Sequence, residues 1–220
     1  MRLDLHAHSR YSPDSRLEPV EIVKAAKARG MDGIAITDHN TVEGVAQARE
    51  YGRSIGVLVV RGTEVSAQKG HILAYGVAEA LPRDRPCTET VEAVLAVGGV
   101  PVAAHPYRFW SGLGEEVTVG APFAAYEVQN ARTLGRGNAQ ARALAARMGV
   151  GATGGSDAHF LFEVGRAVTV VESASTEAEV LEALRSGRTR AEGIDRGAGA
   201  TVRYVTKCVG QWMLRGMRRI

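Results

Sequence analysis

Two histidines separated by a single residue, His6 and His8, stand near the start of the sequence. Leu3, Leu5 and Ala7 alternate with polar residues there, which is the period of a β-strand, so both imidazoles leave the backbone on the same side. Two imidazoles about 7 Å apart on a strand can each give one ring nitrogen to a single metal ion. On its own such a pair more often marks an ordinary half-buried strand, so the other histidines decide between the two interpretations.

The other four histidines each lie at or just after an apolar, strand-like run, and acidic residues accompany most of them. The clusters are His6 with His8, Asp38 with His39, Thr63 with Glu64, Ala104 with His105 and Pro106, and Ser156 and Asp157 with His159, while Asp14 and His71 stand alone. Imidazole suits zinc and iron, and carboxylate suits harder ions such as manganese. Six imidazoles with several carboxylates exceed the needs of one ion, so we predict two or three divalent transition metal ions (manganese, zinc or iron).

Single members of this set also have purely structural alternatives. Asp38 and His39 could form a turn, and Glu64 could be a solvated residue after a strand. His71 could be a hydrogen-bonded histidine of the core. All of these alternatives would have to hold at once for the set to be accidental.

The elements that must position these residues follow from the apolar runs. Strands are predicted at 33–37, 56–60, 71–76, 100–104, 125–130, 151–155 and 167–171, and helices at 19–29, 40–51, 88–97, 138–148 and 177–185. This alternation predicts βαβ units in a mainly parallel α/β sheet, and about seven units favour a barrel over an open sheet. The candidate ligands fall at the C-terminal ends of strands, where such folds build active sites.

Local signals refine two of these helices and one loop. Asn40 with Glu43, and Thr176 with Glu179, have the spacing of a capping box at a helix N-terminus. The glycine-rich stretch 109–121 predicts an ordered loop over the open face of the domain.

Composition limits the class of protein. The 220 residues are 45% hydrophobic and 23% charged, which is typical of one globular domain with a full core. A net charge of +3 with interspersed signs permits anionic substrates without demanding nucleic acid. Cys87 and Cys208 do not have the spacing of metal-binding cysteines, so we expect both to be free thiols. No secretory leader and no membrane-length apolar run is seen, so we expect a cytoplasmic protein.

The composition changes after residue 193, so the chain is divided into a domain at 1–193 and a basic tail at 194–220. Apolar residues are interleaved with arginines over 212–220, which predicts an amphipathic helix. Packing on the barrel or contact with a second copy is favoured over contact with a membrane surface. The oligomeric state is left open.

Taken in order, these motifs resemble those of the PHP family (polymerase and histidinol phosphatase) over residues 1–193. The resemblance implies a distorted (β/α)7 barrel with a cluster of commonly three metal ions at the strand C-termini. It implies three ligand sets: His6, His8, Glu64 and Asp157; Glu64, His71 and His105; and Asp14, His39 and His159. Some members have a histidine where this chain has Asp14, and the carboxylate favours manganese or iron there. Asp38 would accept a hydrogen bond from a ligand imidazole and fix its tautomer.

The activity implied is that of a metal-dependent phosphoesterase, in which a hydroxide activated by the ions attacks phosphorus in line. Arg108, three residues past His105, is the first candidate to bind the phosphate, followed by Arg10 and Arg132, although each could be a surface charge. We expect a phosphatase acting on a small phosphorylated substrate.

Two alternatives remain: a 3′-5′ nucleotide phosphatase or exonuclease of the same family, and a non-catalytic module. The nuclease is disfavoured because residues 72–104, between His71 and His105, leave no room for the inserted domain of the nucleic-acid-processing members. The non-catalytic module is disfavoured because every ligand position is filled.

Overall fold

The structure is a computed structural model that describes residues 1–194 and, in the C-terminal segment, residues 206, 209, 210, 213 and 216. The tail helix predicted within 194–220 therefore lies largely outside the described residues. No helix in the described part of the chain combines the length and the apolar character that a membrane span requires.

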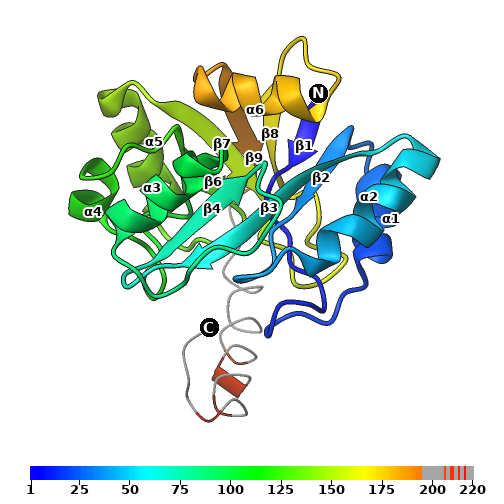
Figure 1. The fold of residues 1–220 in the computed structure, drawn as a ribbon, viewed down its shortest axis with the longest axis horizontal. Helices are drawn as coiled ribbons and strands as arrows, with labels where there is room; N and C mark the ends of the chain where they lie inside the picture. Colours follow the sequence, from blue (N-terminus) through cyan, green and yellow to red (C-terminus); the bar gives the residue numbers. More distant parts are fainter. Residues whose placement is uncertain (195–205, 207–208, 211–212, 214–215, 217–220) are drawn as a thin grey trace.

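Nine strands within residues 1–194 form one sheet that curls into a nearly closed barrel (Figure 1). In chain order they are β1 (Arg2–Asp4), β2 (Gly33–Ile36), β3 (Leu58–Ser66), β4 (His71–Tyr75), β5 (Val100–Ala103), β6 (Ala125–Asn130), β7 (Gly151–Gly155), β8 (Ala167–Val171) and β9 (Thr189–Gly193). Their order in the sheet is β7-β6-β5-β4-β3-β2-β1-β8-β9. The pairings make seven strands run in one direction, and only β4 and β8 run the opposite way.

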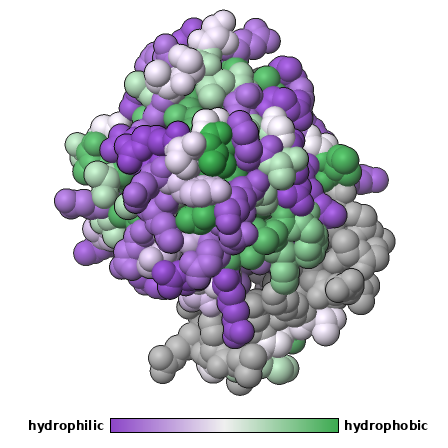
Figure 2. All heavy atoms as spheres, turned by 90° about the vertical axis from the view of Figure 1, so that its right-hand side faces the viewer, coloured by the Kyte–Doolittle hydropathy of each residue, from purple (hydrophilic) through white to green (hydrophobic). Residues whose placement is uncertain are grey.

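Helices lie outside the barrel wall. They are α1 (Pro19–Ala28), α2 (Glu43–Ile55), α3 (Cys87–Ala96), α4 (Glu115–Val119), α5 (Gly137–Met148) and α6 (Glu177–Arg185). Figure 1 shows α1 and α2 on one side, next to β2 and β3, and α3, α4 and α5 on the other side, next to β4 to β7. On the face that carries α1 and α2, hydrophobic residues form separate patches among hydrophilic ones (Figure 2).

The apolar core fills one end of the barrel and leaves the other to polar groups. Val180 and Leu184 of α6 pack with Leu3, Leu5 and other barrel residues in one buried cluster. The α6 helix lies near the N-terminal end of β1 (Figure 1), so this apolar cluster closes that end. The C-terminal ends of the strands, at the other end, are free to carry polar side chains.

The two outer edges of the sheet meet through side chains at a seam between β7 and β8–β9. Gly154 donates its N–H to the hydroxyl oxygen of Thr169 over 2.9 Å. The same hydroxyl donates to the Gly154 carbonyl over 2.9 Å. Nearby, the Thr189 hydroxyl donates to the Ala152 carbonyl over 2.9 Å. Thr169, which is buried, and Thr189, which is half-buried, thus connect the two edges of the sheet by side-chain hydrogen bonds.

The α/β barrel class and its mainly parallel strands are confirmed, and most strands lie where the apolar runs predicted them. The capping box of Thr176 and Glu179 is present. The box predicted for Asn40 and Glu43 is wrong, because α2 begins at Glu43 without a side-chain cap. Asn40 instead has a φ of 59° and accepts a hydrogen bond from the amide of Ser66 over 2.8 Å. The sheet has nine strands, whereas the resemblance implied seven and the apolar runs did not predict β9. The stretch 109–121 contains α4.

Replacing Thr169 with valine tests the seam. Thr169→Val keeps the shape of the side chain but leaves both polar groups of Gly154 without their partner. We expect the free energy of unfolding in urea to fall by about 1–3 kcal/mol. The control Thr88→Val, on the exposed face of α3, should stay within about 0.5 kcal/mol of the parent. Equal midpoints for the two variants would show that the Thr169 pair does not hold the seam.

Candidate metal centre

The predicted ligands converge at the C-terminal end of the barrel. His6 and His8 follow β1, His39 follows β2, and Glu64 lies in β3. His105 follows β5, and Asp157 and His159 follow β7. His71 opens β4, and because β4 runs against its neighbours, its first residue lies at this same end.

Glu64 lies at the middle of the cluster, with only 1% of its surface exposed. Its Oε1 atom lies 2.9 Å from His105 Nε2 and 3.0 Å from His71 Nδ1. Its Oε2 atom lies 3.2 Å from His6 Nε2 and 3.2 Å from His8 Nε2. The two oxygens therefore face two different pairs of imidazoles, as a carboxylate shared by two ions would.

Asp14 occupies one flank of the cluster. Its Oδ2 atom lies 2.6 Å from His159 Nε2 and 3.7 Å from His39 Nε2. Ser12 donates its hydroxyl to Asp14 Oδ1 over 2.8 Å and so holds the carboxylate in place. His39 also reaches toward the centre, with Nδ1 3.5 Å from Glu64 Oε2.

Asp157 lies between two further candidate ligands, His8 and His159. Its Oδ1 atom lies 3.5 Å from His8 Nε2 and 3.5 Å from His159 Nδ1. The backbone of Asp157 has a φ of 53°, and that of His105 has a φ of 28°. Such strained conformations persist where the surroundings impose them, which is common at functional sites.

The donor set fits a cluster of metal ions. Four trios of ligand atoms lie within 4.8 Å of one another among the described residues: His6, Glu64 and His105; His6, His8 and Asp157; His8, Asp14 and His159; and His8, His39 and Glu64. With metal–ligand bonds of about 2.0–2.2 Å, two ligands of one ion lie about 3–3.5 Å apart, which matches the spacing seen here. The buried Nδ1 atoms of His39 and His105 have no hydrogen-bond partner within the described part of the chain. A buried nitrogen without a hydrogen-bond partner is costly. A metal ion beside Glu64 would provide a partner for His39 Nδ1, which lies 3.5 Å from Glu64 Oε2.

The pKa values of the site residues also favour metal binding. Burial opposes ionisation of the Glu64 carboxyl, but the imidazoles around it, His39 foremost, hold its pKa well below the usual range. Burial also opposes ionisation of Asp157, yet Arg108 holds the pKa of that carboxyl well below its usual range. Burial lowers the pKa of His39 to about 3. Ionised carboxylates and neutral imidazoles are the forms that bind metals.

The raised pKa of His8 indicates that negative charge is in excess around its ring. Burial lowers the pKa of its imidazole, but hydrogen bonds to Asp157 and Glu64 outweigh burial and raise that pKa to about 9. The surrounding carboxylates therefore attract a positive charge to this position. A metal ion would supply that charge in place of a proton.

Glu127, in the middle of β6, is a site residue that the sequence analysis missed. Its Oε1 atom lies 2.9 Å from His6 Nδ1, and Oε2 accepts a hydrogen bond from the amide of His105 over 2.9 Å. A Cβ atom at Gly155 would lie 2.3 Å from His6 Cβ and 2.9 Å from Glu127 Oε1, so only glycine allows this approach. The available signal was an acid inside the predicted strand 125–130.

Asp38 lies behind the cluster, but its carboxylate holds a different partner from the one predicted. It accepts a hydrogen bond from the hydroxyl of Ser9 over 2.6 Å. Its backbone carbonyl accepts hydrogen bonds from the Thr63 hydroxyl over 2.8 Å and from the Glu64 amide over 3.2 Å. Asp38 therefore positions β3, and the hydrogen bond to an imidazole is made by Glu127 instead.

Two of the three predicted arginines reach the cluster. Arg108 forms an ion pair with Asp157 Oδ2. Arg132, only 4% exposed, donates to the Asp157 carbonyl over 3.2 Å and contacts His159. Arg10 pairs at the surface with Glu18, with Nε 2.8 Å from Oε2.

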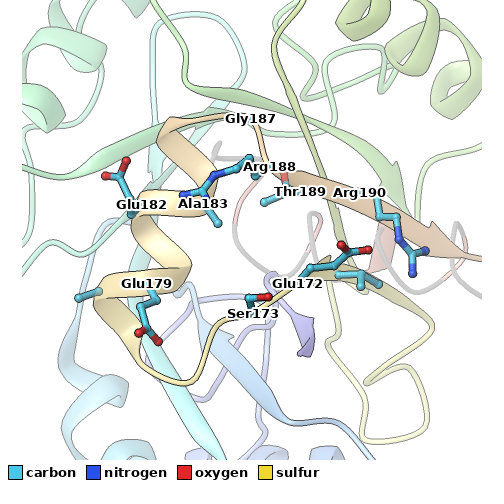
Figure 3. Close-up of a pocket in the computed structure, with 11 residues that line it drawn as sticks. Glu172, Ser173, Glu179, Glu182, Ala183, Gly187, Arg188, Thr189 and Arg190 are labelled. Atoms are coloured by element: carbon cyan, nitrogen blue, oxygen red, sulfur yellow. The ribbon is translucent and has the colours of Figure 1, made fainter.

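A depression at the other end of the barrel is a competing location. It opens between β8, α6 and β9 and is lined by charged side chains that include Glu172, Glu179, Glu182, Arg188 and Arg190 (Figure 3). The depression lies next to Val171, whose N–H donates to the Met1 carbonyl just before β1. His6 and His8 follow the other end of β1. None of the four trios found among the described residues includes a residue from this depression. The candidate site is therefore the cluster around Glu64.

A barrel with buried imidazoles and carboxylates at its strand ends belongs to a class of folds that can hold metal ions there, and comparison with known proteins gives the family. The PHP domain model matches residues 4–133, and a PHP-associated model matches residues 135–189. The first match alone covers more than half of the chain. The chain belongs to the PHP domain family.

Several relatives share parts of the chain. An uncharacterized protein from Methanocaldococcus jannaschii is 38% identical over 128 residues, 53% of this chain and 75% of that protein. A 5′-3′ exoribonuclease from Haemophilus influenzae is 28% identical over 158 residues, 65% of this chain and 56% of the exoribonuclease. A 3′,5′-nucleoside bisphosphate phosphatase from Chromobacterium violaceum is 38% identical over 84 residues, 36% of this chain and 29% of the phosphatase. The chain thus spans 56% of the exoribonuclease and 29% of the phosphatase.

A solved structure shares the fold. A two-domain protein from Bacteroides vulgatus that contains a predicted PHP-like metal-dependent phosphoesterase superposes with a TM-score of 0.72 at 20% identity. The match covers 94% of this chain and 70% of that protein.

Replacing Glu127 tests whether it orients His6. Glu127→Gln turns one of its two acceptor oxygens into a donor, which must then face either the His6 ring or the His105 amide. We expect metal affinity, measured by competition with a chromogenic chelator, to fall about 10- to 100-fold. The exposed control Glu50→Gln should bind metal like the parent. Unchanged affinity in Glu127→Gln would remove this residue from the site.

Proposed function

We propose that the protein hydrolyses small phosphomonoesters with two or three divalent metal ions held at the C-terminal end of the barrel. The observation that carries the proposal is the buried carboxylate of Glu64, whose two oxygens face two different pairs of imidazoles at 2.9–3.2 Å. A carboxylate placed in this way can bridge two ions. The predicted ligand sets remain our assignment: His6, His8, Glu64 and Asp157; Glu64, His71 and His105; and Asp14, His39 and His159.

Manganese, iron or zinc ions at these positions would lower the pKa of water and neutralise the oxygens of the phosphoryl group. The residues of the chain supply orientation. Glu127 directs His6, and Arg132 holds Asp157 and His159 from behind. Arg108 contacts Asp157 through one arm of its guanidinium, and we assign it to binding the phosphate, for which its planar fork is suited.

The preference for small monoesters over polymers rests on two features. The segment 72–104 consists of β4, α3, β5 and their connections, so no additional domain lies between His71 and His105. The net charge of +3 offers no strong electrostatic track for a nucleic acid backbone. The bisphosphate phosphatase relative is in keeping with a monoester, whereas the exoribonuclease relative favours the nuclease alternative.

Replacing the central carboxylate tests the shared-ligand arrangement. Glu64→Gln removes a charge that two ions would share, so turnover of p-nitrophenyl phosphate should fall at least ~100-fold. Asp14→Asn, which alters one flank, should cost less. Metal content is measured on the same samples and should be two or three ions per chain in the parent. A Glu64→Gln enzyme with parental turnover and metal content would contradict the assignment.

Substrate preference separates the phosphatase from its alternatives. At equal metal loading, we expect release of phosphate from p-nitrophenyl phosphate or histidinol phosphate, and weak or absent cleavage of short RNA. Much faster turnover of RNA or of a 3′,5′-bisphosphorylated nucleotide would favour the nuclease or nucleotide phosphatase. No hydrolysis with manganese, iron or zinc would favour the non-catalytic module.

A further inference from the structure

Two pairs of aromatic side chains stand on the segments that leave the metal centre. Phe109 and Trp110 are 87% and 86% exposed, and their rings meet edge to face with centroids 4.7 Å apart. Phe162 is 58% exposed, and its ring stacks on that of Phe160 at 5.3 Å. Single exposed apolar residues are ordinary, but neighbouring aromatic residues exposed to this extent often mark a binding surface.

The turn that carries Phe109 and Trp110 is held firmly at its base. Gly112 donates its N–H to the Arg108 carbonyl over 2.9 Å, and Leu113 is fully buried. A Cβ atom at Gly112 would lie 2.5 Å from the Pro106 carbonyl oxygen, so the turn can close this tightly only with glycine. The two rings therefore project from a fixed turn.

The turn that carries Phe160 and Phe162 is also anchored. Glu163 accepts a hydrogen bond from the His159 amide over 2.9 Å, and its own amide donates to the Phe160 carbonyl over 2.9 Å. The Arg166 guanidinium lies 5.7 Å from the centre of the Phe162 ring.

The ion pair between Arg108 and Asp157 joins the two segments at the metal centre. Phe109 directly follows Arg108, and Phe160 directly follows His159. Both aromatic pairs therefore begin at the group assigned to the phosphate or at a candidate metal ligand. The chain thus carries these rings directly from the residues assigned to the phosphate and to the metal ions.

We propose that Phe109, Trp110, Phe160 and Phe162, here called the aromatic rim, bind a flat aromatic ring in the leaving group of the substrate. This inference rests on the proposed function and names its substrate class: phosphoesters of aromatic alcohols or of nucleosides. All four side chains of the rim are hydrocarbon faces apart from one indole N–H. The rim therefore recognises the face of a ring and distinguishes aromatic from aliphatic esters more strongly than one nucleobase from another.

The kinetic test compares three substrates: phenyl phosphate, adenosine 5′-phosphate and glycerol 1-phosphate. Trp110→Ala should raise KM about tenfold for both ring-bearing esters and leave their kcat unchanged, because stacking on a ring contributes binding alone. The KM for glycerol 1-phosphate should not change. The control Leu95→Ala removes another exposed apolar side chain, from α3, and should leave all three substrates unaffected. Equal changes for all three esters would overturn the proposal.

A binding measurement provides a readout independent of turnover. The chain has two tryptophans, so Trp212→Phe leaves Trp110 as the sole indole. Titrating this variant with phenylphosphonate, which cannot be hydrolysed at its C–P bond, should change Trp110 fluorescence, while methylphosphonate should not. An unchanged signal with phenylphosphonate, although phosphate still inhibits turnover, would overturn the rim and leave the proposed function standing.

Further outcomes separate the remaining possibilities. A response to adenosine 5′-phosphate without one to phenyl phosphate would assign the rim to nucleosides, and the reverse would assign it to simple aryl esters. If Trp110→Ala converts a dimer into a monomer in sedimentation and leaves every KM unchanged, the rim is a contact between copies and the inference fails. If no phosphoester is hydrolysed at all, the proposed function itself fails.

Discussion

The structure depends on one buried carboxylate, that of Glu64. A charge removed from water is costly unless polar partners or cations surround it, and an uncompensated one destabilises a fold strongly. Here the compensation comes from imidazoles on segments that follow β1 and β5 and from the start of β4. These segments meet only because the sheet curls into a barrel. Closing the barrel and assembling the metal centre are therefore the same structural event.

A surrounding layer keeps the imidazoles in position. Glu127 contacts the ring of His6 and the backbone of His105, and Gly155 leaves room for Glu127 and His6. The carbonyl of Asp38 accepts the Glu64 amide and so fixes β3 beside β2. At the opposite end, α6 supplies apolar side chains that exclude water from the barrel interior. The polar end of the barrel thus carries the candidate metal ligands, and the apolar end carries buried side chains that stabilise the fold.

The candidate ligands that the sequence marks by residue type and by their place at strand ends lie together in the structure. The sequence predicted the barrel because apolar runs alternate with helical patterns. A run does not reveal the direction in which a strand pairs, so the reversal of β4 and β8 was not predicted. Glu127 was missed because a buried acid is informative only once its partner, 121 residues away, is placed. The Asn40 box failed because a left-handed backbone and a bond to Ser66 take that side chain elsewhere.

The most direct test of a metal cluster centred on Glu64 is X-ray diffraction at the absorption edges of manganese, iron and zinc, from protein purified without chelator. We expect two or three anomalous peaks about 2.0–2.2 Å from ligand atoms of the nine assigned side chains, with Glu64 between two of them. A single peak that does not touch Glu64, or no peak after the protein has been supplied with each metal, would contradict this expectation.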